Sequence, residues 1–248
     1  MPLYAQIPRH WDAGVDEMLK NIHKVLSAVD AVVDCSIIGG ETLLYSESEL
    51  CRLIDDLKAS RKIIKIAVTT NGTLIPGEKL ISCLRDPRVY VIISDYGRVS
   101  AKVGELVKLL EKNGVLYNLI PFSEKDDGWV DFGKVFPRGR SCEELKDLFF
   151  RCKSASSCNP MIGDRLYPCG RASRLTDLGL KDTEYGDFAV LSDDPKETRQ
   201  TIEKFLAMDS IPSCDWCDSI LGEKVKPAVQ LEANAIAAGS EALSGTRT

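Results

Sequence analysis

The 248-residue sequence contains only two histidines, and its apolar residues never form a long uninterrupted run. No stretch approaches the roughly 18 apolar residues of a membrane span, and residues 1–14 lack the apolar segment of a signal peptide. A net charge of −5 argues against nucleic acid or an anionic membrane as a partner. A Walker loop, a dinucleotide-binding glycine motif and a Ser/His/Asp order are also absent. We therefore expect a cytoplasmic protein whose thiols stay reduced.

The first half of the chain repeats an α/β pattern. Four β-rich apolar runs occur at regular intervals, at Val32–Ile38, Ile63–Thr69, Val89–Ser94 and Val115–Ile120. Each run is largely continuous rather than alternating, which predicts strands covered on both faces. Amphipathic helical stripes accompany them, at residues 15–26 after Asp12, at residues 50–57 after the capping box Ser46/Glu49, and at residues 103–110 before Asn113-Gly114. This order predicts an α/β fold with successive strand–helix units.

The chain begins with a helix, although a strand–helix architecture normally begins with a strand. Residues 1–11 hold two prolines and no apolar run, so we expect a parallel sheet, or a partial parallel (βα) barrel, that lacks its first strand. After about residue 125 the character changes, and a small Cys-rich part follows. There the sequence predicts a capped helix at Ser141/Glu144, a hairpin at Met161–Tyr167 and a helix that begins at Asp194-Pro195.

Five cysteines in this later part are the main chemical feature: Cys152, Cys158, Cys169, Cys214 and Cys217. The C-x-x-C pair, Cys214 and Cys217, places two thiolates about one metal coordination edge apart, and cysteines from another segment complete a cage for zinc or an iron–sulfur cluster. Buried apolar cysteines or disulfides are the structural alternative. We expect Cys169 and the C-x-x-C pair to bind the metal, with either Cys152 or Cys158 as the fourth ligand.

Two arginine pairs flank the cysteines. Arg138 and Arg140 precede them, and Arg171 and Arg174 follow Cys169. An anionic substrate is one explanation for such pairs. Arginines in loops are more often solvated, and we interpret these four as solvated loop charges.

Polar, glycine-containing corners follow the first three predicted strands. They contain Gly39, Gly40 and Glu41 after the first, Asn71 after the second and Asp95 after the third. Ligands of parallel α/β sheets bind beyond the carboxyl ends of the strands. Glycines let the backbone approach a ligand closely, and the three polar side chains supply acceptors for an ammonium group or a ribose. Simple turn chemistry is the alternative, but three such corners at one end favour a ligand-binding face.

These motifs resemble the core of radical S-adenosylmethionine (radical SAM) enzymes. The resemblance is carried by Ile37-Ile-Gly-Gly-Glu-Thr-Leu-Leu44 and Val68-Thr-Thr-Asn-Gly-Thr-Leu-Ile75. It implies that Gly39, Gly40 and Glu41 contact the amino group of S-adenosylmethionine, with Thr42 in place of the usual proline. Cys158…Leu166-Tyr-Pro-Cys169 and Cys214-x-x-Cys217 are similar to the SPASM/Twitch type of C-terminal domain, which implies an auxiliary [4Fe–4S] cluster. The resemblance covers roughly residues 10 to 230 and rests on the order and spacing of the motifs.

One departure from the family is decisive. Its radical-generating primary cluster is held by C-x-x-x-C-x-x-C after the first strand, and this sequence contains no such motif. Cys35 lies within a predicted strand, and Cys51 and Cys83 on helical patterns, so none can substitute. The motif and the first strand are missing from the same place, so we expect an N-terminally shortened enzyme, with a remnant that has lost its primary cluster as the alternative. S-adenosylmethionine binding should be impaired and its reductive cleavage absent.

The resemblance therefore implies a truncated radical SAM (βα) domain, a partial parallel barrel that lacks its first strand, at residues 1–140 and an auxiliary-cluster domain at 141–232. The Ala/Ser/Gly-rich composition of residues 233–248 predicts a disordered tail. The full-length form is expected to generate a 5′-deoxyadenosyl radical, with a low-potential electron donor, and to modify a small-molecule or peptide substrate. No nucleic-acid or membrane partner is expected. The rival hypothesis is a non-catalytic iron–sulfur or zinc-binding module that transfers electrons or binds another protein.

Overall fold

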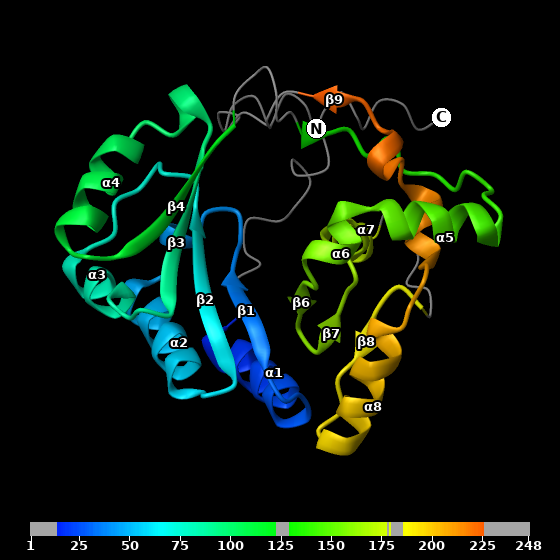
Figure 1. Ribbon diagram of the computed structural model, residues 1–248, viewed down its shortest axis with the longest axis horizontal. Helices are drawn as coiled ribbons and strands as arrows, with labels where there is room; N and C mark the ends of the chain where they lie inside the picture. The colour runs from blue at the N-terminus through cyan, green and yellow to red at the C-terminus, as the bar shows by residue number, and fades with distance from the viewer. Residues whose placement is uncertain (1–13, 123–128, 178, 180–185, 226–248) are drawn as a thin grey trace.

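A four-stranded parallel sheet organises the first half of the protein. The computed structural model describes residues 14–122, 129–177, 179 and 186–225, so the predicted cap Asp12 and the predicted tail lie outside it. The strands are β1 (Val32–Ile37), β2 (Ile63–Thr70), β3 (Val89–Asp95) and β4 (Leu116–Pro121). They pair in sequence order, each parallel to the next (Figure 1). Every boundary lies within one residue of its predicted place, and the predicted α/β class is confirmed.

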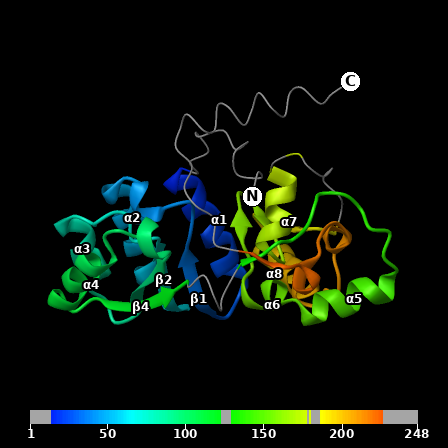
Figure 2. The ribbon, with the colours of Figure 1, turned by 90° about the horizontal axis from the view of Figure 1, so that it is seen from above.

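Four helices pack against this sheet in the described part: α1 (Val15–Ala28), α2 (Glu47–Ala59), α3 (Glu78–Leu84) and α4 (Val103–Lys112). Their apolar stripes form one core with β2 and β3, in which Ile54, Leu57 and Leu110 are fully buried. Figure 2 shows the helices gathered on one side of the strands. No helix in the described ranges is long and apolar enough to cross a bilayer.

The prediction that the strands are covered on both faces is wrong. Residues of β3 alternate between buried and half-buried, and no residue of β1 or β4 is fully buried. Val33, Ile64 and Leu116 leave half or more of their surface exposed. This exposure has two causes. The described helices cover one face of the sheet, and β1 and β4 are its outer strands.

Short elements make up the rest of the described chain. They are β5 (Trp129–Val130), α5 (Cys142–Arg151), α6 (Lys153–Ser157), β6 (Met161–Ile162), β7 (Arg165–Leu166), α7 (Gly170–Asp177), β8 (Ala189–Val190), α8 (Pro195–Leu206), the 3-10 turns η4 (Pro212–Trp216) and η5 (Ser219–Leu221), and β9 (Lys224–Val225). The predicted hairpin forms as β6 and β7, and Gly163 makes its turn with a positive φ of +58°. β5 pairs antiparallel with β9.

Helix α8 attaches this C-terminal part to the sheet by packing alongside α1 (Figure 1). A small apolar cluster of Ala28, Leu191 and Ile202 lies at the contact. Arg199 on α8 forms an ion pair with Asp30, with an Nη2–Oδ2 distance of 3.0 Å. The residues just after α1 and the middle of α8 are therefore held together by both apolar and charged groups.

Of the three predicted helix starts that lie within the described residues, two form as expected. The Ser141/Glu144 capping box is complete, and Asp194 accepts hydrogen bonds from two backbone N–H groups of α8. Ser46 is the residue before α2, but its hydroxyl bonds to Ser48 instead of the backbone N–H of Glu49. The capping box predicted at the start of α2 therefore does not form.

The buried helix stripes should dominate the stability of the sheet half. Substituting Leu57→Ala on α2, whose side chain is fully buried, should lower the free energy of unfolding by about 2–5 kcal/mol because it leaves a cavity. Leu206→Ala on α8 is the matched control, since Leu206 is 68% exposed. Urea unfolding measures both, and equal losses in the two variants would contradict this account of the core.

Candidate functional site

Four of the five clustered cysteines line one cavity in the C-terminal part. Cys152, Cys169, Cys214 and Cys217 surround a space of about 30 Å³. Cys152 directly follows α5, Cys169 directly precedes α7, and the C-x-x-C pair lies in and just after η4. Three segments that are far apart in the sequence therefore meet here. The rest of the wall is mainly apolar and includes Phe132, Leu148, Phe149 and Ile211.

Cys158 lies apart from this cavity. It directly follows α6 and is an exposed residue. Partial burial of its sulfur and the nearby charge of Asp34 raise the pKa of the thiol. Of the two residues predicted as alternatives for the fourth ligand, the structure brings Cys152 to the other three cysteines.

Three of the cavity thiols, those of Cys169, Cys214 and Cys217, are in an environment that raises their pKa. All nine cysteines are described, and none is in a disulfide. Burial raises the pKa of Cys169 to about 11 and that of Cys214 to about 12, and the neighbouring thiols add to the effect. Burial also raises the pKa of Cys217. A metal at this site would have to displace these protons, so binding would be coupled to proton release.

Backbone N–H groups are directed at two of the sulfurs. Ala172 N donates to Cys169 Sγ at 3.4 Å, and Ser219 N donates to Cys217 Sγ at 3.2 Å. Both bonds favour the thiolate and so oppose the effect of burial. Ser219 has a φ of +45°, the only positive value outside glycine among the described residues. Such a conformation is costly and is maintained by its surroundings, and here it accompanies the N–H bond to Cys217.

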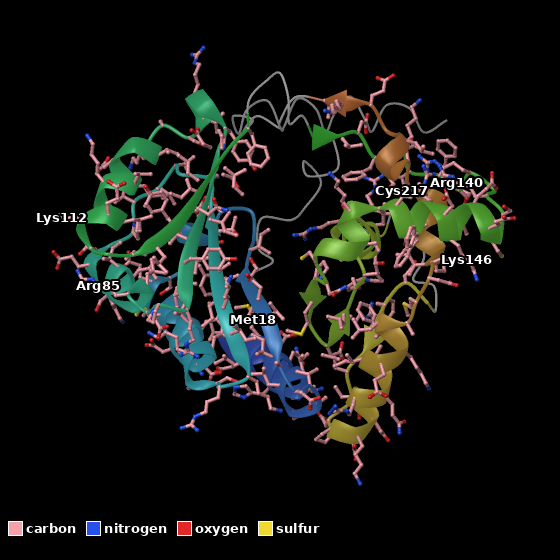
Figure 3. The ribbon with its side chains drawn as sticks, viewed as in Figure 1. Met18, Arg85, Lys112, Arg140, Lys146 and Cys217 are labelled. Carbon is pink, nitrogen blue, oxygen red and sulfur yellow. The ribbon has the colours of Figure 1, made fainter. Side chains whose placement is uncertain are left out.

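Arg140 holds the C-x-x-C segment in place. Its Nη1 donates to the carbonyl oxygens of Cys214 and Cys217, at 2.9 and 2.8 Å. Figure 3 shows Arg140 and Cys217 next to one another in the C-terminal part. In return, Asp215 Oδ1 accepts a hydrogen bond from the backbone N–H of Arg140 at 2.8 Å. The two segments therefore hold each other through side chain and backbone together.

The interpretation of these arginines as solvated loop charges is wrong for three of them. The side chains of Arg138 and Arg140 are 12% and 15% exposed. Arg138 Nε forms an ion pair with Asp218 Oδ1 at 2.7 Å, which lowers the pKa of that carboxyl. Arg171 lines the cysteine cavity. Sequence composition could not distinguish these residues from solvated ones, because their partners come from distant segments.

The donor set of the cavity has the chemistry of a metal site. Within the described residues, no group of three or more His, Cys, Asp or Glu side chains is arranged to hold a single metal ion as it stands. The four cysteines thus surround the cavity without converging on one point. Four thiols with N–H donors at their sulfurs are nonetheless the ligand chemistry of tetrahedral zinc and of iron–sulfur clusters. On donor chemistry, the residues fit either group.

The second group of predicted residues lies at the carboxyl edge of the sheet, where Glu41 joins two strand ends. Its Oε1 accepts from Leu43 N at 2.9 Å and from Thr70 Oγ1 at 2.8 Å, and its Oε2 accepts from Asn71 N at 2.7 Å. A carboxylate has about four acceptor positions. Donors from the described residues occupy three of them, so among these residues one position on Oε2 is left for a ligand.

Ser100, a residue that the sequence reasoning missed, links Asn71 to Ser94 and Tyr96, the residues on either side of Asp95. The Ser100 hydroxyl donates to the carbonyl oxygen of Asn71 at 2.6 Å and lies 3.2 Å from that of Ser94. Asp95 Oδ1 accepts from Gly97 N at 2.8 Å. Ser100 carries no sequence signal, because a serine before a helix also serves as an ordinary cap.

Gly39 and Gly40 are exposed and open to solvent. A Cβ added to either would meet no heavy atom within 4 Å. The packing of the protein therefore does not require glycine at these two positions, and open backbone beside a sheet edge suits close approach of a ligand.

No model of a known protein family matches the sequence, and no curated protein matches it significantly. The family assignment therefore rests on the short motifs alone.

Glu41 should matter for stability even without a ligand. Glu41→Ala would leave the donors of Leu43, Thr70 and Asn71 without their acceptor and should lower the free energy of unfolding by about 1–3 kcal/mol. Glu41→Gln keeps one carbonyl acceptor, so its free energy of unfolding should lie between those of the unmodified protein and Glu41→Ala. Glu105→Ala, at an exposed position on α4, is the control in urea unfolding. A loss for Glu41→Ala no larger than for this control would refute the bridging role.

Arg140 should keep the C-x-x-C segment ordered. Because Arg140→Gln removes the donor shared by two carbonyl oxygens, we expect faster amide hydrogen exchange at residues 214–219 and a stability loss of about 1–3 kcal/mol. Arg151→Gln is the control, since Arg151 is half exposed and pairs with Asp147 one helical turn away, where a pair contributes about 0.5 kcal/mol or less. Unchanged exchange in Arg140→Gln would contradict the role.

Proposed function

We propose that this protein is an iron–sulfur protein of the radical SAM type, which binds an auxiliary [4Fe–4S] cluster through Cys152, Cys169, Cys214 and Cys217. The observation that carries the proposal is the meeting of these four cysteines at one cavity. Thiolates are the ligands of such clusters. In contrast, Cys158 does not line this cavity and has no place in the proposed ligand set.

Two further observations support a centre at this place. N–H donors are directed at Cys169 and Cys217, as is common where thiolates bear the charge of a metal centre. Arg140 ties together the two carbonyl groups of the C-x-x-C segment. Both features position the ligands before a metal is bound.

At the sheet, we propose a site for S-adenosylmethionine formed by Gly39, Gly40, Glu41, Asn71 and Asp95. In this proposal the parallel sheet is part of a (βα) barrel, and the open acceptor position on Glu41 Oε2 receives the ammonium group of the methionine moiety. The hydrogen-bonded link from Glu41 to Asn71 supports a common site. Together with a primary cluster, the cofactor supplies a 5′-deoxyadenosyl radical for hydrogen abstraction from an organic substrate.

The sequence contains no C-x-x-x-C-x-x-C motif to hold that primary cluster. We therefore propose that these 248 residues by themselves do not cleave S-adenosylmethionine, and that radical modification of a small molecule or peptide, driven by a low-potential donor, would need a primary cluster held by other cysteines. The chain itself would contribute the auxiliary centre and the edge of the sheet.

A zinc-binding module without catalytic activity is the second candidate. One observation favours it, because a cavity of about 30 Å³ accommodates one or two water-sized groups, and a four-iron cluster requires it to widen. Four thiolates suit zinc as well as they suit iron. Metal analysis separates the two candidates directly.

The test is anaerobic reconstitution with ferrous iron and sulfide. The unmodified protein should bind about four iron and four sulfide per chain. Cys152→Ala should bind less than half of this amount, because one of four ligands is lost, while Cys158→Ala should match the unmodified protein. Iron and sulfide analysis with the visible spectrum measures all three.

Two results would overturn the proposal. Protein that takes up one zinc and no sulfide would favour the zinc module. Loss of iron in Cys158→Ala, with full binding by Cys152→Ala, would place the ligand set elsewhere.

A further inference from the structure

Buried polar atoms without a hydrogen-bond partner gather at the cysteine cavity. Among the described residues four side-chain atoms are buried in this way: Thr42 Oγ1, Arg171 Nε, Ser213 Oγ and Ser219 Oγ. The last three belong to residues that line the cavity. A buried polar group without a partner costs about 1–3 kcal/mol, and such groups are rare in native proteins. Three at one place indicate a partner that the described residues do not supply.

The two serines have fixed backbones and unused hydroxyls. Ser213 N donates to Oδ1 of the buried Asp187 at 2.7 Å, and the residue is 2% exposed. Ser219 is held at positive φ with its N–H on Cys217 Sγ at 3.2 Å. One serine directly precedes Cys214, and the other follows Cys217 by two residues. Their hydroxyls therefore flank the C-x-x-C pair at the cavity wall.

Arg171 brings a positive charge to the same wall. Its Nη2 donates to Gly133 O at 3.1 Å, and its guanidinium lies 5.6 Å from the centre of the Phe132 ring. These contacts hold the side chain but leave Nε without a partner. The charge of Arg171 also acts on Cys217, where it opposes the effect of burial on the thiol.

We propose that Ser213, Ser219 and Arg171 donate hydrogen bonds to the sulfur atoms of the metal centre held by the four cysteines, and thereby raise its reduction potential. This inference rests on the proposed function. One-electron reduction, for example by dithionite, adds one negative charge to the cluster and breaks no bond. Donors and a cation at its sulfurs stabilise the more negative state, so they make the cluster easier to reduce.

The test is a redox titration of the reconstituted protein, followed by electron paramagnetic resonance. We expect a more negative midpoint potential in Ser213→Ala and in Ser219→Ala, and a further shift in the double variant. Arg171→Gln should shift it most, because it removes a charge as well as a donor. Ser210→Ala is the matched control, since the Ser210 hydroxyl bonds to Asp209 outside the cavity, and its potential should not change.

Three additional measurements guard against a purely structural effect. Ser213→Thr keeps the hydroxyl, so its midpoint potential should equal that of the unmodified protein. Ser219→Gly removes the hydroxyl but accommodates the positive φ, so it should shift the potential as Ser219→Ala does. In protein loaded with Co²⁺ instead of iron, loss of a donor should move the sulfur-to-cobalt charge-transfer band to longer wavelength.

The outcomes separate the inference from the proposed function. If the unmodified protein binds metal but the serine and arginine variants have the potential and the cobalt band of Ser210→Ala, the inference is wrong and the proposed function stands. If the unmodified protein binds neither iron with sulfide nor cobalt, both are wrong.

Discussion

Parallel pairing of β1 to β4 determines where the polar groups of the first half lie. Because all four strands run in the same direction, a helix on one face of the sheet must carry the chain back between them. The chain therefore leaves every strand at the same edge, the carboxyl edge of the sheet. The side chain of Glu41, in the corner after β1, then bonds to Asn71 in the corner after β2. Ser100 joins the corners after β2 and β3. These contacts make the edge one hydrogen-bonded surface, whether or not a ligand binds there.

The C-terminal part is held together differently. Its elements are short, and its described apolar clusters are small. Order there comes from polar contacts between distant segments, such as Arg140 with Cys214 and Cys217 and Arg138 with Asp218. Hydrogen bonds to buried charged groups carry more energy than neutral ones, which suits a region that places thiols around a cavity with little core behind them.

Much of the fold could be predicted from the sequence, because apolar periodicity and helix caps are local signals. The strands and the caps at Ser141 and Asp194 depend only on nearby residues. Whether Cys152 or Cys158 joins the other cysteines depends on how α5 and α6 pack, and the partners of Arg140 lie more than 70 residues away. The prediction that both faces of the sheet are covered was wrong for the same reason, since an apolar run does not reveal which face a helix covers. The metal and the cofactor remain predictions.

The contacts of residues 129–140 with the last described segment bear on the order of events during synthesis. β5 pairs with β9, and Asp218 N donates to Phe132 O at 2.9 Å. The parallel sheet is complete once β4 has left the ribosome, yet Cys152 and Cys169 then wait for the C-x-x-C segment, a delay on the order of seconds at typical translation rates. During that interval Cys152, Cys169 and the strand β5 lack their later partners. This region can therefore take its final form only after residues 214–225 have been synthesised.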